Sequence, residues 1–132
     1  MPKWSVAVLA DIVFDCRHPA SLARFWAQVL DGYDVAPYDA DEIARLAALG
    51  ITDVEDDPTV LVEGPSGPRL WFQRVPEPKT NKNRVHLDVR SADRAAEVRR
   101  LVGLGASVLD EPAGMGLTVL CDPEGNEFCV ID

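Results

Sequence analysis

Histidine and cysteine are scarce in this sequence of 132 residues, which contains two histidines and three cysteines. Two histidines exclude a metal cage built from imidazole groups. The cysteines are odd in number and lack the Cys-x-x-Cys spacing of a redox pair or a zinc knuckle, which favours free thiols in a reducing compartment. The histidines are His18 and His86, and the cysteines are Cys16, Cys121 and Cys129.

Basic residues and long apolar runs are also in short supply. Thirteen basic residues face 22 acidic ones, so the net charge is -9. This charge repels phosphate backbones and anionic lipids, and we expect neither a nucleic-acid nor a membrane partner. It would favour a cationic ligand, or it serves solubility alone. No apolar run approaches the roughly 18 residues of a membrane span, and the first residues do not resemble a signal peptide, so we expect a cytoplasmic protein.

The remaining composition is that of an ordinary globular protein. Hydrophobic residues make up 47% of the chain and charged residues 27%. A chain of this length is expected to fold as one domain, residues 1–132, with its own core.

An internal repeat organises the chain. A shift of 73 positions superposes five residues on identical ones, and a shift of 58 superposes the turn sequence Gly-Pro-Ser-Gly at 64–67 on Asp-Pro-Glu-Gly at 122–125. Internal repeats indicate that one supersecondary unit occurs twice. The five residues that the longer shift superposes on their identical partners are Asp15, Arg17, Ala23, Gly32 and Val35.

Each half is predicted to contain a strand, an amphipathic helix and three further strands. The expected ranges in the first half are 6–16, 19–30, 59–63 and 69–75, and in the second half 84–89, 92–104, 117–121 and 127–131. Residues 39–50 form an extra helix in the first half only. Module one then covers about 4–75, a linker rich in proline and polar residues about 76–83, and module two about 84–132. The fold class is α+β with two βαβββ modules; a single ferredoxin-like sheet is the alternative.

Two segments carry a resemblance to a known superfamily. They are His-Pro-Ala-Ser-Leu-Ala-Arg-Phe-Trp at 18–26 and Asp-Pro-Glu-Gly-Asn-Glu-Phe-Cys-Val at 122–130. With the duplicated module, they resemble the vicinal oxygen chelate superfamily, in particular the glyoxalase-like domains of glyoxalase I, bleomycin-resistance proteins and extradiol dioxygenases. The resemblance implies that the sheets form an open curled barrel around a ligand pocket, commonly in a homodimer.

Metal-dependent members of the superfamily place four ligands in the pocket. The resemblance carries these positions to Asp11, Trp71, Arg84 and Cys129, with Arg84 assigned as the partner of Asp11 by the shift of 73. An indole has no lone pair to donate and a guanidinium repels a cation, so this set does not suit a divalent metal. We therefore expect no cofactor and disfavour glyoxalase I activity, although a metal held elsewhere stays possible.

Alternation along the strands predicts a polar face toward the pocket, because residues two apart share a face. An alternative is that this face is simply solvated.

His86 is the best candidate for a catalytic residue or a shifted metal ligand, the alternative being a structural histidine. Trp71 would stack on a flat ligand, or pack in the core or a dimer contact. The expected ligand-binding residues are Asp11, Trp71, Gln73, Arg84, His86, Asp88, Glu127 and Cys129.

Three functions from different classes remain open on these residues. The first is a metal-independent protein that binds a polar or cationic aromatic molecule. The second is a metal-dependent lyase, isomerase or dioxygenase of the superfamily that uses a site around His86. The third is an interaction domain with a vestigial pocket.

Overall fold

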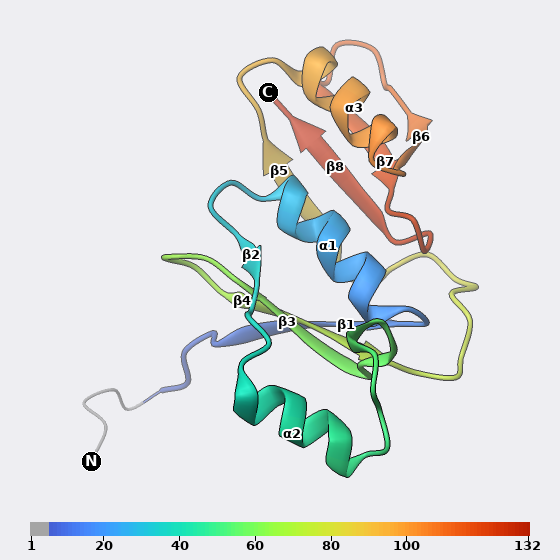
Figure 1. Ribbon diagram of the computed structural model, residues 1–132. Coiled ribbons are helices and arrows are strands. Elements are labelled where there is room, and N and C mark those ends of the chain that lie inside the picture. Colours follow the sequence, from blue (N-terminus) through green and yellow to red (C-terminus); the bar gives the residue numbers. More distant parts are fainter. Residues whose placement is uncertain (1–5) are drawn as a thin grey trace.

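The computed structural model describes residues 6–132, and the first residues of the expected module one, 4 and 5, lie outside them. Each half of the chain builds its own four-stranded sheet (Figure 1). The first half contains β1 (Asp11–Cys16), α1 (Pro19–Val29), β2 (Asp34–Val35), α2 (Ala40–Ala48), a 3-10 turn (Val54–Asp56), β3 (Thr59–Glu63) and β4 (Arg69–Arg74). The second half contains β5 (Leu87–Arg90), α3 (Arg94–Gly103), β6 (Ser107–Asp110), β7 (Leu117–Cys121) and β8 (Glu127–Ile131).

The two sheets have the same topology. Their strand orders are β1-β4-β3-β2 and β5-β8-β7-β6. In each sheet the first strand runs parallel to the last, and the other neighbours are antiparallel. The duplicated α+β fold expected from the sequence is thus confirmed, and the extra helix α2 interrupts the first copy only.

Strand register corrects the alignment of the two copies. Val13 pairs with Trp71, and Asp88 pairs with Cys129. Trp71 and Cys129 are equivalent at the shift of 58, so Val13 is equivalent to Asp88, which is a shift of 75. The residue equivalent to Asp11 is therefore His86, and its assignment to Arg84 was wrong by two positions.

The shift between equivalent residues changes from 75 to 73 inside the helical segment. Helix α1 begins at Pro19 and α3 at Arg94, so the two helices start 75 positions apart. The strands after the helices follow the shorter shift of 73. There Val35 pairs with Val62, and Val108 makes the equivalent pair with Leu120. The first copy is two residues longer between the start of its helix and its second strand. The identity at Val35 therefore marks structural equivalence, and the identities at Asp15 and Arg17 do not.

Both central hairpins turn at a glycine in the left-handed region. Gly67 has a φ of +87° and Gly125 a φ of +90°. Side chains are strained at such φ values, and glycine adopts them freely. The turns expected at 64–67 and 122–125 are therefore present, and the strands on either side of them start and end within one residue of the expected positions.

Helix α1 lies between the two sheets and packs against both (Figure 1). Trp26 of this helix has only 1% of its surface exposed. Its ring centroid lies 5.1 Å from that of Phe14 in β1 and 5.0 Å from that of Phe128 in β8. A single aromatic side chain thus joins the cores of the two modules, since paired aromatic rings at this spacing pack favourably.

Hydrogen bonds from the β7–β8 turn strengthen the joint between the modules. Buried Asp122 accepts a hydrogen bond of 3.0 Å from Nε1 of Trp26. The Glu124 carboxylate accepts from the backbone N–H groups of Arg17 at 2.7 Å and His18 at 2.9 Å, immediately before α1. The Asp-Pro-Glu-Gly turn of module two therefore fixes the start of the helix of module one.

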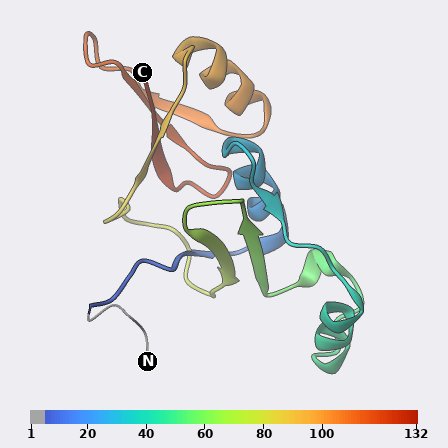
Figure 2. The same ribbon diagram turned by 90° about the vertical axis from the view of Figure 1, so that its left-hand side faces the viewer.

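The linker follows the opposite side of the molecule. Residues 76–83 have no regular structure and cross from one sheet to the other on the side away from α1 (Figure 2). Strands β1 and β5 begin later than expected, at Asp11 and Leu87. None of the helices in the described range is long and apolar enough to cross a membrane.

Candidate functional site

The face of the first sheet opposite α1 carries three of the expected site residues. Arg69 donates to both carboxylate oxygens of Asp11, at 2.8 and 3.1 Å, and its guanidinium carbon lies 5.8 Å from the centre of the Trp71 ring. Nε2 of Gln73 donates to Asp15 at 2.8 Å. The hydrogen bonds from Arg69 lower the pKa of Asp11. The Asp11 carboxylate is therefore ionised and already paired.

The second sheet brings three further expected residues together on its own face. Nε2 of His86 lies 3.2 Å from Oδ1 of Asp88, and donor atoms of His86, Asp88 and Cys129 all lie within 4.8 Å of one another. His86 and Asp88 are exposed, whereas Cys129 is buried with 8% of its surface exposed. Burial, and then the negative charge of Asp88, raise the pKa of the Cys129 thiol.

This donor set fits a divalent metal better than the set expected from the sequence. Imidazole, carboxylate and thiolate are the ligands that zinc takes in proteins, and three protein ligands leave a coordination position for water or substrate. A bound ion would have to displace the thiol proton, since the raised pKa keeps Cys129 neutral near pH 7. His86, Asp88 and Cys129 are thus the described residues that would hold such an ion.

Glu127 has a structural role in the linker. One carboxylate oxygen accepts from Lys79 Nζ at 2.9 Å and the other from the backbone N–H of Asn83 at 2.8 Å. The Asn83 hydrogen bond, followed by the one from Lys79, lowers the pKa of Glu127 to about 2. Both oxygens are engaged, so Glu127 fixes the path of the linker toward β5.

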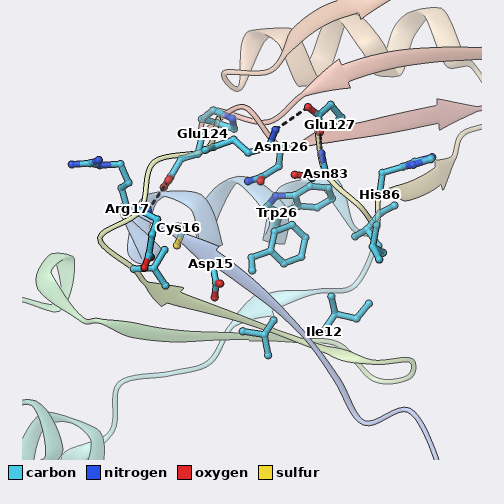
Figure 3. A pocket seen from close by; sticks show the side chains of 18 of the residues that line it. Ile12, Asp15, Cys16, Arg17, Trp26, Asn83, His86, Glu124, Asn126 and Glu127 are labelled. Atoms are coloured by element: carbon cyan, nitrogen blue, oxygen red, sulfur yellow. Dashed lines mark hydrogen bonds and ion pairs between the residues drawn. The ribbon is translucent and has the colours of Figure 1, made fainter. Parts of the chain in front are cut away.

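A cavity of about 1090 Å³ lies between the modules (Figure 3). Its volume slightly exceeds the range of about 300–1,000 Å³ that is usual for small-molecule sites. Strand β1, the linker, the residues before β5 and the β7–β8 turn form its walls, with Ile12, Phe14 and Trp26 as apolar lining. Polar or charged residues that line it are Asp15, Arg17, His18, Glu77, Lys79, Asn83, Arg84, His86, Glu124, Asn126 and Glu127.

The cavity collects only some of the expected site residues. Arg84, His86 and Glu127 line it, whereas Asp11, Trp71, Gln73, Asp88 and Cys129 do not. Sequence reasoning assigned no role to His18, which lines the cavity, and did not single out Asn83 or Glu124. Glu124 belongs to the recognised Asp-Pro-Glu-Gly turn, but the partners of its carboxylate, the N–H groups of residues 17 and 18, leave no signal in the sequence.

Charges in the cavity are distributed unevenly between paired and unpaired groups. Asp15, Glu124 and Glu127 all accept hydrogen bonds from the protein. Within residues 6–132, the guanidinium groups of Arg17 and Arg84 make no hydrogen bond or ion pair, and neither does the Glu77 carboxylate. A ligand in the cavity would therefore meet three carboxylates that are already engaged, one carboxylate that is not, and two unpaired guanidinium groups.

Residues 11–131 match the family of the glyoxalase-like domain. The chain belongs to this family. The match spans both modules and the linker, so the resemblance to the vicinal oxygen chelate superfamily is confirmed. No curated protein matches this glyoxalase-like protein at a significant level.

Solved structures support the same fold. A glyoxalase/bleomycin resistance protein/dioxygenase family enzyme from Burkholderia phytofirmans matches with a TM-score of 0.64 at 17% identity, over 94% of this chain and 97% of that one. The fosfomycin resistance protein FosX from Mesorhizobium loti matches with a TM-score of 0.65 at 15% identity, over 96% of this chain and 91% of that one. At these identities the likeness establishes the fold and leaves the ligand open.

Proposed function

We propose that this glyoxalase-like domain binds a small organic acid in the cavity between its modules, with Arg84 as the partner of the acidic group. The observation that carries the proposal is the unpaired guanidinium of Arg84 in a cavity where three of the four lining carboxylates are already engaged. A guanidinium forms short, strong hydrogen bonds to carboxylates and phosphonates. The apolar lining of Ile12, Phe14 and Trp26 would accommodate the carbon skeleton.

The proposal keeps the polar organic ligand expected from the sequence and revises its charge. The net charge of -9 favoured a cation. A bound ligand responds mainly to nearby charges, because distant exposed charges are screened by salt beyond about 8 to 10 Å. Arg84 lines the cavity, and so does Arg17.

Three probes of similar size and different charge test this proposal: benzoate, benzamide and benzylamine. The indole N–H resonance of Trp26 in ¹H–¹⁵N spectra reports occupancy, because Trp26 lines the cavity. We expect benzoate to bind more tightly than benzylamine, and Arg84→Gln to weaken benzoate about tenfold.

Arg99→Gln is the matched control, because Arg99 is exposed on α3 and does not line the cavity, yet its loss changes the net charge equally. Benzoate should bind this variant as it binds the unaltered protein. Equal weakening by the two substitutions, or tighter binding of benzylamine than of benzoate, would overturn the proposal.

Metal-assisted chemistry is a second candidate, favoured by the group of His86, Asp88 and Cys129. A divalent ion held there would act as a Lewis acid toward a bound oxygen. The metal alone is the probe: Co²⁺ bound through Cys129 should produce a thiolate charge-transfer absorption. His86→Ala should weaken Co²⁺ binding, and His18→Ala should leave it unchanged. A protein that binds no Co²⁺ or Zn²⁺ at neutral pH would refute this candidate.

A further inference from the structure

The extra helix α2 is attached to the first sheet through a buried carboxylate. Asp57, with 1% of its surface exposed, accepts hydrogen bonds from the Tyr38 hydroxyl at 2.7 Å, from Arg45 Nη2 at 3.1 Å and from the backbone N–H of Thr59 at 2.9 Å. Arg45 also donates through Nε to Glu42 at 2.6 Å. These contacts hold α2 and the segment before it at a fixed position beside β3.

A second cavity of about 330 Å³ lies beside this network. It shares no lining residue with the cavity between the modules. Its lining combines Tyr38 and Trp71 with the aliphatic side chains of Pro37 and Leu61, and Arg45 and Glu42 supply polar groups. A volume near 300 Å³ and mostly apolar walls with few polar groups are typical of a site for a small molecule.

The charged groups of this cavity are largely neutralised by one another. Arg45 pairs with both Glu42 and Asp57, which leaves one negative charge in excess. An anionic ligand would meet two carboxylates, and a cationic ligand would meet the Arg45 guanidinium. Within the described residues, Nη1 of Arg45 and Oε1 of Glu42 have no hydrogen-bond partner. The cavity therefore offers one donor group and one acceptor to a ligand without net charge.

We propose that the cavity beside α2 is a second binding site, for a neutral planar molecule that carries an amide. The amide oxygen accepts from Arg45 Nη1 and the amide N–H donates to Oε1 of Glu42. The ring packs against Trp71, one of the two aromatic side chains of the lining. The two unpaired atoms of Arg45 and Glu42 then gain a partner, which gives selectivity against the acid of the same shape.

Benzamide and benzoate test the selectivity, because they have the same shape and differ in charge. The probe resonance is the indole N–H of Trp71, assigned through Trp71→Phe. We expect benzamide to shift this resonance with a Kd about tenfold lower than that of benzoate. Glu42→Gln removes the excess negative charge, and it should reduce this preference to about twofold.

Ala36→Phe places a ring in the cavity and should abolish the Trp71 shift. Ala44→Phe is its matched control, because Ala44 is exposed on α2 and does not line the cavity. A Trp71 resonance that benzamide does not move would overturn the proposal, as would equal binding of the two probes or benzamide binding that survives Ala36→Phe. These readings are independent of the Trp26 resonance and of Arg84, so this site and the one between the modules stand or fail separately.

Discussion

Replacing Trp26 with phenylalanine would remove a side chain that packs on both sheets and donates a hydrogen bond to the β7–β8 turn. The phenylalanine ring keeps an aromatic contact with Phe14 and Phe128 but cannot donate to Asp122. Asp122 would remain buried, with the backbone N–H groups of Glu124 and Asn126 and the Asn126 amide as its remaining donors.

The expected loss has two parts. Removing a hydrogen bond to a charged buried group costs about 1.5–3 kcal/mol. The smaller ring leaves part of the Trp26 volume unfilled at a site with 1% exposure, which adds about 1 kcal/mol. We expect the free energy of unfolding to fall by about 3 kcal/mol, a large part of the stability of a domain this size.

Urea unfolding followed by circular dichroism measures this loss without depending on the tryptophan signal. Trp71→Phe is the control, because Trp71 is only half-buried and its substitution should cost less than about 1 kcal/mol. A Trp26→Phe variant that loses less than about 1 kcal/mol would show that the hydrogen bond to Asp122 does not couple the modules.

Two further predictions concern titratable groups. Glu127 has a folded pKa of about 2, below its ordinary value, so its contribution to stability is complete above about pH 5 and is lost as pH falls toward 2. The stability difference between the unaltered protein and Glu127→Gln, measured by urea unfolding, should shrink over this range. A constant difference would contradict the linker contact. Burial raises the pKa of the Cys16 thiol to about 12. Iodoacetamide at pH 8 should therefore label Cys16 in the native protein far more slowly than partly exposed Cys121, which mass spectrometry would measure. Similar labelling rates would show that Cys16 is accessible.

Sequence patterns located the hairpins well and the first strand of each module less well. β3, β7 and β8 cover the expected ranges, because apolar alternation and turn glycines are local signals. The residues directly before Asp11 form a continuous apolar run, and apolar alternation continues before Leu87, but within the described chain neither segment is paired in a sheet. Asp11 and Leu87 pair with Arg69 and Phe128, which lie at or beside the start of β4 and β8.

The candidate site was harder to predict because its partners are distant in the sequence. The strand parity of Asp88 and Cys129 indicated a shared face, and the two residues pair directly in the sheet. The use of Glu127 by Lys79 and Asn83, which lie 48 and 44 positions away, follows from the path of the linker and has no local pattern. Identity matching misplaced Arg84 because a length difference inside the helical segment changes the shift.

The expected homodimer stays a prediction. β1 and β5 each lie at an edge of their sheet, with a hydrogen-bonded neighbour on one side only among the described strands. Such edges are suited to contact with another chain. Sedimentation at several protein concentrations would measure the oligomeric state.

No backbone ladder connects the two sheets in the described chain, so side chains and the linker set the angle between the modules. The larger cavity lies at this joint. A molecule that binds both β1 and the residues before β5 therefore contacts both modules at once. A substitution at Trp26 would therefore act on ligand binding in two ways, by altering the cavity wall and by altering the joint between the modules.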